Sequence, residues 1–317
     1  CEMCIRDRFN LGRDCGSLED ALARVTCPVL VVSFRTDWLF PPAHSRRMVD
    51  ALLAQGKRVS ALEVDSDCGH DAFLLENDLH VYGPLMAGFL RRGPACAAER
   101  LQGAKPGAKG GAQAGATGHE AAQTNVRSIF FQSRLDLARI AELIPVGASV
   151  LDLGCGAGHL LGRLRCRGSG ALLGLELNPQ DIVECVGQGL CVVQRDLDRG
   201  LGVFGDGQFD VVVLSQTLQA MRRPDRVLTE MLRVGKTGIV SFPNFAHAPA
   251  VRQLAENGTS PVTEGLPFPW WSSPSIRFFS IKDFENLCRD LGISVLTRIA
   301  IDSATGEQIE TGHNTRA

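Results

Sequence analysis

The feature that most constrains the fold is a short apolar segment interrupted by three alternating glycines, VLDLGCGAGHLL at residues 150–161. Gly154, Gly156 and Gly158 follow a strand-like run, and apolar residues resume directly after them. Glycine adopts backbone conformations that clash for other residues, and its missing Cβ lets a ligand approach the backbone. The pattern predicts a strand, a tight turn and a helix. It leaves two interpretations open: a turn that only packs, or a loop that binds a ligand.

The residues around this turn alternate between short apolar runs and segments of helical spacing. Such alternation predicts a doubly wound parallel α/β sheet. Two further strands are expected near the end of the chain, at 276–281 and 293–300, on either side of a helix at 282–292. The other expected strands are 149–154, 171–177, 190–196, 209–215 and 237–243, and the other expected helices are 135–144, 158–166, 179–188 and 224–234.

Acidic residues stand where ligand contacts are expected in such a sheet. Glu176 ends the strand that follows the glycine turn, 22 positions after Gly154, and could accept two ribose hydroxyls. Asp196 ends the next strand and could receive an adenine amino group. Asp152 lies inside the first strand, where it could orient the turn or meet a cationic group of a ligand. The competing interpretation is that Glu176 is a solvated strand end and that the turn binds nothing.

Four segments in this order, VLDLGCGAGHLL, GLELNP, QRDLD and FDVVVLSQTL, resemble the class I S-adenosylmethionine-dependent methyltransferase fold. The wider stretch of about 133–302, including LPFPWWSSPSIRFFSIKDFENLCRDLGI, is similar to the MetW family of methionine biosynthesis. That family is described as a methyltransferase-like partner of homoserine O-acyltransferase. The resemblance implies an S-adenosylmethionine site on Asp152, Gly154, Gly156, Gly158, Glu176, Asp196 and Leu197.

Methyl transfer depends mainly on positioning the donor against an acceptor, and a base is needed only when the acceptor must lose a proton. His159, Gln216 and His247 stand near the expected pocket mouth. His159 is better explained as a surface or capping residue, and His247 as a hydrogen-bonded loop residue, than either is as a base. Trp270 and Trp271 are expected to form a packed lid or a partner surface, with an acceptor-site wall as the alternative.

An upstream block has its own α/β pattern, with strands expected at 27–34 and 58–64 and helices at 44–56 and within 71–92. Asp37 follows the first strand and His70 follows the second, 33 residues later. This is the order of the acid and the base in the triad of α/β-hydrolases, where the acid holds the imidazole and the imidazole takes a proton from serine. Ordinary polar loop residues are the alternative.

SFRTDWLFPP followed by SDCGHDAFLLEN resembles the C-terminal end of the MetX family of homoserine O-acetyltransferases, over about residues 17–92. The resemblance implies that Asp37 and His70 are the acid and the base of a catalytic triad. No G-x-S-x-G motif occurs in the 317 residues. We therefore expect the chain to be a fragment of a longer fusion protein, and acyl-CoA to bind only in that full-length parent. Residues 1–16 are unassigned, and the opening CEMCIRDRFN is not expected to be native folded sequence.

A linker is expected between the two blocks, at residues 93–125. Its central part, 103–118, holds six glycines and five alanines in 16 residues, so it cannot bury an apolar face. The linker divides a C-terminal fragment of an α/β-hydrolase, residues 17–92, from a domain at 126–302, which a tail at 303–317 follows. The expected partner is the acyltransferase domain on the same chain, and a homodimer of the chain is a further alternative.

Composition narrows the classes of function. The formal net charge is −2, which gives no support to a nucleic-acid or membrane-surface role. No apolar run reaches the roughly 18 residues of a membrane span. The eleven cysteines are scattered, which predicts that the protein resides in a reducing cytoplasm. Cys1 and Cys4 form one C-x-x-C without a second pair, so we expect no metal site.

Together these features predict a domain that binds S-adenosylmethionine and supports or regulates homoserine acylation in methionine biosynthesis. Two alternatives remain at this stage: a methyltransferase that acts on a small molecule, and a scaffold in which the glycine turn binds nothing.

Overall fold

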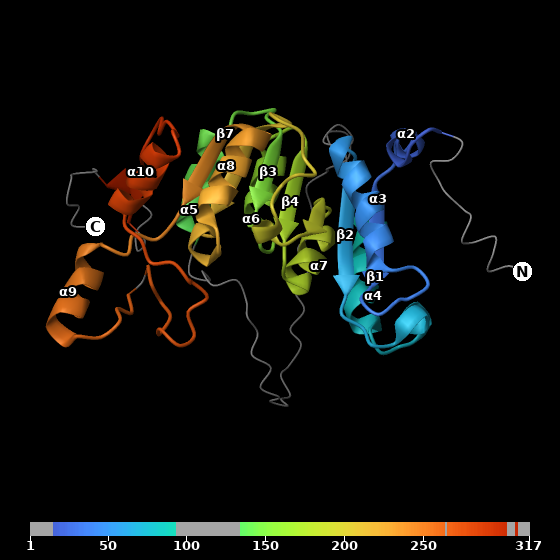
Figure 1. Cartoon of the computed structure of the whole chain (residues 1–317), viewed down its shortest axis with the longest axis horizontal. Helices are drawn as coiled ribbons and strands as arrows, with labels where there is room; N and C mark the ends of the chain where they lie inside the picture. The colour runs from blue at the N-terminus through green and yellow to red at the C-terminus, as the bar shows by residue number, and fades with distance from the viewer. Residues whose placement is uncertain (1–14, 93–133, 264, 303–307, 310–317) are drawn as a thin grey trace, which may run out of the picture.

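The computed structural model describes residues 15–92, 134–263, 265–302 and 308–309. Seven strands of these segments form one parallel sheet in the order β1-β2-β5-β4-β3-β6-β7 (Figure 1). The strands are β1 (Val29–Phe34), β2 (Val59–Val64), β3 (Val150–Leu153), β4 (Leu172–Glu176), β5 (Val192–Gln194), β6 (Phe209–Ser215) and β7 (Gly235–Ser241).

The predicted doubly wound parallel sheet is confirmed by the order of strands β5-β4-β3-β6-β7. The chain leaves β3 toward β4 and β5 on one side, and then returns to add β6 and β7 on the other side. The order reverses between β3 and β6, and ligands of such sheets bind at the carboxyl ends of the strands at this point. The glycine turn at residues 154–158 follows β3, so it lies at that switch point.

Helices cover both faces of the sheet, as apolar residues on alternate sides of the strands require. Residues of α3 and α8 share one buried cluster with Leu151 and Leu153 of β3. Residues of α4 and α7, and those of α5 and α6, belong to two clusters on other strand residues, such as Val150. The helices are α2 (Leu18–Ala23), α3 (Pro42–Ala54), α4 (Leu79–Arg92), α5 (Leu135–Leu143), α6 (His159–Cys166), α7 (Pro179–Gly187), α8 (Pro224–Val234), α9 (Ala248–Asn257) and α10 (Ile281–Asp290).

Capping residues define where several helices begin. Asn178 caps α7 by accepting from the N–H of Gln180, and Pro179 occupies the first helical position. Ser280 and Asp283 form a reciprocal capping box at the start of α10. The predicted helix within 71–92 divides into a 3₁₀ helix, η1 (Gly69–Leu74), and α4. Pro84 lies inside α4 without ending it.

The two blocks that the sequence separates lie side by side in one sheet (Figure 1). β2 pairs in parallel with β5, with Ala61 opposite Val193. Leu52 of α3 belongs to the same buried cluster as Val193, so the apolar core is continuous across the junction. On the other face α4 packs against α7, where a Cβ on Gly88 would come within 2.9 Å of the Gly187 Cα. We call residues 15–92 the N-terminal unit and residues 134–302 the C-terminal unit.

The prediction of two strands near the end of the chain, at 276–281 and 293–300, is wrong. Residues 276–281 form no strand, because the N–H groups of Ile276 and Arg277 both donate to the carbonyl of Gln219 rather than to a neighbouring strand. Of residues 293–300, only Ala300 enters a strand, in the two-residue β8 (Ala300–Ile301), which pairs with β9 (Gln308–Ile309). Leu296 is exposed, so this apolar segment lacks the burial that stabilises a strand.

Candidate functional site

The glycine turn has a backbone that only glycine adopts easily. Gly154, Gly156 and Gly158 have φ values of 72°, 52° and 78°. Two of the three are also required by internal packing. A Cβ on Gly154 would lie 2.7 Å from the Thr217 Oγ1, and a Cβ on Gly158 would lie 2.8 Å from the Cys185 Sγ. Close packing therefore explains the outer glycines, and the central one must be explained by what its backbone contacts.

The Glu176 carboxylate is hydrogen-bonded to the backbone of the central glycine, Gly156. One oxygen, Oε2, accepts the N–H of Gly156 at 2.8 Å. The other, Oε1, accepts the N–H groups of Leu177 at 2.7 Å and Asn178 at 3.0 Å. Three backbone donors thus hold the side chain at the end of β4 and beside the turn. The oxygen Oε2 has one of these donors and retains capacity for a ligand hydroxyl.

Asp152 is the most unusual charge of the site. Its side chain is 3% exposed in the middle of the sheet, and within the described residues no hydrogen bond reaches its carboxylate. Burial raises the pKa of Asp152 to about 7. The Arg134 guanidinium opposes this shift, and the carboxylates of Glu176 and Asp136 add to it. A buried carboxylate without a partner is costly, so this position suits a cationic group supplied by a ligand.

A polar network beside Asp152 was not anticipated from the sequence. Arg134 forms a two-point ion pair with Asp136, with distances of 2.9 and 3.1 Å, and also donates to the Ser215 Oγ at 2.6 Å. The Ser215 and Ser241 hydroxyls, 2.9 Å apart, both contact Asp136. A sequence signal existed, because Ser215 and Ser241 each end a strand at the same edge of the sheet. The hydrogen bonds of Arg134 thus go to Asp136 and Ser215, and within the described residues Arg134 acts on the Asp152 carboxylate only through its charge.

Asp196 and Leu197 differ from the other predicted ligand residues. The Asp196 carboxylate caps a short 3₁₀ helix, η2 (Leu197–Arg199), by accepting the N–H of Asp198 at 3.0 Å, and its second oxygen lies 3.5 Å from the Arg199 Nε. The Leu197 side chain is buried in the apolar core. Both residues follow β5 at the same sheet edge as Glu176. Asp196 is half-exposed and remains accessible to a ligand amino group.

The second predicted pair, in the N-terminal unit, comes together in space. The His70 Nδ1 lies 3.2 and 3.3 Å from the two Asp37 carboxylate oxygens. The Asp37 Oδ1 also accepts the N–H groups of Leu39 at 2.9 Å and Phe40 at 2.8 Å. Burial alone would raise the pKa of Asp37, but the hydrogen bonds from Phe40, His70 and Leu39 together lower it. Asp37 is therefore a fixed anion that orients the imidazole, as a triad acid does.

Local contacts fix the loops that carry this pair. Gly69, with φ of 66°, turns the chain into η1, and its N–H donates to the Thr36 Oγ1 at 3.0 Å. The Thr36 hydroxyl in turn donates to the Ser66 carbonyl at 2.7 Å. The His70 ring lies between the rings of Phe40 and Phe73, with centroids 5.3 and 5.7 Å away. These contacts hold His70 at the carboxyl end of the two strands, while part of its ring stays exposed.

No hydrogen bond among the described residues joins His159, Gln216 and His247, the three residues that the sequence places near the pocket mouth. His159 is exposed on the first turn of α6. His247 caps α9, and its Nδ1 lies 3.1 Å from the Asn244 carbonyl. Gln216 is more distinctive: it is the one non-glycine with positive φ, 52°, among the described residues. Its Oε1 is also buried without a hydrogen-bond partner. A strained residue with an unpaired polar atom at the end of β6 suggests a ligand contact.

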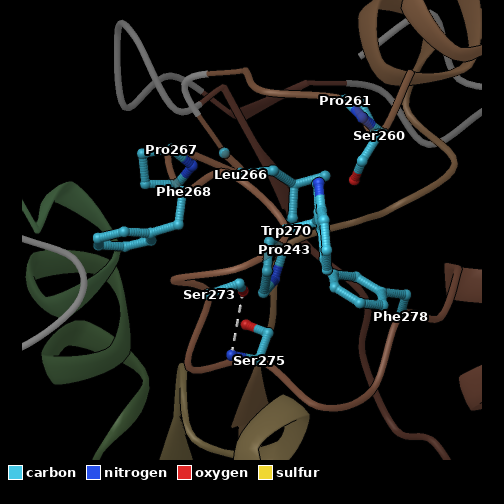
Figure 2. Close-up of a pocket in the computed structure, with 11 residues that line it drawn as sticks. Pro243, Ser260, Pro261, Leu266, Pro267, Phe268, Trp270, Ser273, Ser275 and Phe278 are labelled. Carbon is cyan, nitrogen blue, oxygen red and sulfur yellow. Dashed lines mark hydrogen bonds between the residues drawn. The ribbon is translucent and has the colours of Figure 1, made fainter.

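The adjacent tryptophans lie outside the apolar core. Trp270 and Trp271 are 71% and 72% exposed, so the prediction of a packed lid is wrong. Figure 2 shows that Trp270 lines a small pocket together with Pro243 and Phe278. A hydrogen bond from the Ser275 N–H to the Ser273 Oγ, 3.2 Å long, shapes the loop beneath it. The exposure of the indoles leaves the other half of that expectation, a partner surface, as a prediction.

The described segments contain neither a cluster of metal-ligating side chains nor a helix suited to a membrane. Within residues 15–92, 134–263, 265–302 and 308–309, no group of three or more His, Cys, Asp or Glu side chains could hold a metal ion. In the same segments, no helix combines the length and the apolar character that a bilayer crossing needs. Cys1 and Cys4 lie outside the described residues.

The strand order of the C-terminal unit, with its glycine turn after β3, defines a methyltransferase-like Rossmann fold. The sequence model described as "Methionine biosynthesis protein MetW" matches residues 134–316, and the chain belongs to the MetW family. A relative over nearly the whole chain is the bifunctional methionine biosynthesis protein MetXA/MetW of Rhodopirellula baltica. It is 36% identical over 313 residues, which are 96% of this chain and 46% of that protein. The chain thus spans about half the length of this relative.

Shorter matches cover the N-terminal unit. A homoserine O-succinyltransferase of Litchfieldella anticariensis is 52% identical over 77 residues, 24% of this chain and 19% of that protein. A homoserine O-acetyltransferase of Citrifermentans bemidjiense is 43% identical over 86 residues, 27% of this chain and 23% of that protein. Among solved structures, a methyltransferase from Mesorhizobium loti is 17% identical, with a TM-score of 0.41 over 54% of this chain and 83% of that one. The chain therefore joins a MetW region to an acyltransferase-like segment.

Proposed function

We propose that the C-terminal unit binds S-adenosylmethionine and that binding regulates or supports a homoserine O-acyltransferase carried by the N-terminal unit. The observation that carries the proposal is Asp152, which is buried beside the glycine turn and receives no hydrogen bond from the residues that the structure describes. S-adenosylmethionine bears an ammonium and a sulfonium group, and either cation would stabilise the ionised carboxylate. Glu176, held beside Gly156, supplies acceptor capacity for hydroxyls.

The residues present fit this ligand, and each would have a separate role. Asp152 would meet a cationic group, Glu176 would accept the ribose hydroxyls, and Asp196 would receive the adenine amino group. Gly156 would admit the ligand to the backbone, while Gly154 and Gly158 maintain the turn. When bound, S-adenosylmethionine would supply an activated methyl group, although a sensing role does not require its transfer.

The N-terminal unit contributes the other half of the proposed activity. Asp37 would hold the His70 imidazole, which would take the proton of a serine hydroxyl during acyl transfer to homoserine. Relatives named as succinyltransferases and as acetyltransferases both match this segment, so its residues do not distinguish between the two acyl groups. Binding of a later product of methionine metabolism would report methionine supply to the enzyme that commits homoserine to the pathway.

Calorimetric titration of S-adenosylmethionine into the full chain tests the ligand. Wild type and Asp206→Asn, which alters an exposed carboxylate beside Arg233, should bind equally. Asp152→Asn should weaken binding by about tenfold or more, because the charge that the cation meets is lost. Absence of saturable heat in the wild type, or equal affinity in Asp152→Asn, would refute the proposed site.

A methyltransferase that acts on a small molecule is the second candidate. Gln216 favours it, since its strained backbone and unpaired Oε1 at the end of β6 suggest a contact to an acceptor. This function predicts that the chain forms S-adenosylhomocysteine in the presence of a suitable acceptor. It also predicts that Gln216→Ala slows the reaction without weakening S-adenosylmethionine binding.

A further inference from the structure

The carboxyl end of β5 contacts both units of the chain. Gln194 stands directly opposite Glu176 in the register of β4 and β5. Its Nε2 donates to the Leu177 carbonyl at 3.1 Å, on the ligand side. Its Oε1 accepts the Glu63 N–H of β2 at 2.8 Å, on the side of the N-terminal unit. One amide side chain therefore bridges the residues around the predicted ligand acid and the strand that leads to His70.

Arg195, the next residue, also connects the Glu176 region to the N-terminal unit. The Arg195 N–H donates to the Glu176 carbonyl at 2.9 Å. The Arg195 guanidinium forms an ion pair with Asp50 of α3, in the N-terminal unit. Two consecutive residues thus each make one bond toward Glu176 and one bond toward residues 15–92. The two bonds toward the N-terminal unit are part-buried, which limits the competition from water there, whereas the bond from Gln194 to the Leu177 carbonyl is exposed.

The bonds on the ligand side belong to the same short segment that holds the Glu176 carboxylate. Leu177 donates its N–H to the Glu176 Oε1, and its carbonyl accepts from Gln194. A ligand that bonds to Glu176 would restrict the carboxylate and the backbone of residues 176–178. The Leu177 carbonyl would then be held more firmly for Gln194, and the Gln194 Oε1 for Glu63. Ordering at one site thus lowers the cost of ordering at the other.

We propose that Gln194 and Arg195 couple ligand occupancy at Glu176 to the attachment of the N-terminal unit along the β2–β5 edge. This inference rests on the proposed S-adenosylmethionine site and names the route of its regulation. Both sites lie at the carboxyl ends of strands in the same parallel sheet, with β5 between β2 and β4. Because coupling is reciprocal, firmer attachment of residues 15–92 also tightens ligand binding.

Hydrogen exchange of the full chain, with and without saturating S-adenosylmethionine, tests the coupling. Wild type is compared with Gln194→Met, which removes both amide bonds at similar side-chain length. Gln208→Met is the matched control, because the Gln208 Nε2 also bonds across the units, to the Leu53 carbonyl at 3.0 Å, without contacting the ligand residues. The ligand should slow exchange of the β2 amides about fivefold or more in wild type and Gln208→Met, and less than about twofold in Gln194→Met.

The outcomes separate the inference from the function on which it rests. No calorimetric binding of S-adenosylmethionine to the wild type would overturn both. Binding without slower exchange in β2, or equal slowing in Gln194→Met, would overturn the coupling alone. If Gln194→Met does not fold, Gln194→Glu repeats the measurement, since it keeps an acceptor for the Glu63 N–H and loses the donor to Leu177. The coupling then requires that the slowing is lost in Gln194→Glu and kept in Gln208→Met.

Discussion

Each unit has one buried aspartate, Asp37 after the end of β1 and Asp152 near the carboxyl end of β3, and the two carboxylates have opposite properties. Asp37 of the N-terminal unit is 8% exposed, and Asp152 of the C-terminal unit is 3% exposed. Asp37 accepts two backbone N–H groups and contacts His70, and these hydrogen bonds lower its pKa in spite of burial. Asp152 has no such bond within the described segments, and burial raises its pKa to about 7.

Burial raises the pKa of both carboxylates, and only Asp37 has hydrogen bonds that outweigh this effect. The Asp37 site is complete around its acid, because the protein itself supplies every donor. The Asp152 site is incomplete around its acid, and a ligand cation is the group that would complete it. The Asp37 carboxylate orients the neighbouring His70 imidazole. The ionised Asp152 carboxylate destabilises the free protein, and a bound cation would remove this destabilisation. The following predictions test this contrast.

The largest expected effect is stabilisation by Asp152→Asn. The folded pKa of about 7 lies above the ordinary value of 3.8, so the folded state binds this proton more tightly than the unfolded state. Stability is therefore lost as the pH rises from about 4 through about 7. The substitution should raise the free energy of unfolding by about 4 kcal/mol at pH 8, as measured by urea denaturation.

The same variant provides its own control through pH. At pH 4 the carboxyl is neutral in the folded state and about half ionised in the unfolded state, whose pKa is 3.8. The gain should therefore fall below about 1 kcal/mol there. A gain that is equal at pH 4 and pH 8 would contradict the assignment of a raised pKa to Asp152.

A second prediction asks whether the two compared regions form one unit. Gly88→Ala would place a Cβ 2.9 Å from the Gly187 Cα, forcing α4 away from α7, and should cost about 2 kcal/mol. Gly83→Ala, in the same helix, would meet only the flexible end of Leu79 at 3.2 Å and should gain up to about 1 kcal/mol. Equal effects of the two substitutions on urea denaturation would mean that the α4–α7 contact does not form.

Asp37→Asn should have the opposite sign to Asp152→Asn. The lowered pKa of Asp37 contributes stability above the ordinary value of 3.8, and this stability is lost as the pH falls through the folded pKa. Loss of the charge-assisted bonds to Leu39, Phe40 and His70 should cost about 1–2 kcal/mol at pH 7. Thermal melts of the two asparagine variants, side by side at pH 7, measure the contrast. If Asp37→Asn also raised the melting temperature, the proposed difference between the two carboxylates would be contradicted.

The smallest effect concerns the pH dependence of ligand binding. If a cation meets ionised Asp152, affinity for S-adenosylmethionine should fall by up to about tenfold for each pH unit below about 7. Arg134, Glu176 and Asp136 also act on the Asp152 carboxyl through their charges. A second group titrates in the same range, because burial, followed by the charges of Glu176 and Glu184, raises the pKa of Asp181 to about 6. Calorimetry from pH 5.5 to 8 should therefore show a weaker dependence in Asp152→Asn. An unchanged profile in that variant would assign the dependence to Asp181.

Much of the C-terminal unit could be predicted from local patterns. Runs such as FDVVVLS become buried strands wherever a parallel neighbour exists, and β6 (Phe209–Ser215) agrees with its predicted bounds. The glycine turn after β3 was also predictable, since the φ values of Gly154, Gly156 and Gly158 are unfavourable for other residues. The late segments 276–281 and 293–300 failed because strand-like composition does not supply a pairing partner.

The sequence by itself determined the order of the seven strands of the sheet and of the helices between them, the glycine turn, and the residue types at the ends of the strands. Only the tertiary structure decided that β2 pairs with β5, which places Gln194 and Arg195 between the two units. It also decided that the hydrogen bonds of the Arg134 guanidinium go to Asp136 and Ser215, so that Arg134 acts on Asp152 only through its charge. The physical reason is that periodicity is a local property of the chain. The partner of an edge strand or of a buried carboxylate depends on groups that are distant in sequence and meet only after folding.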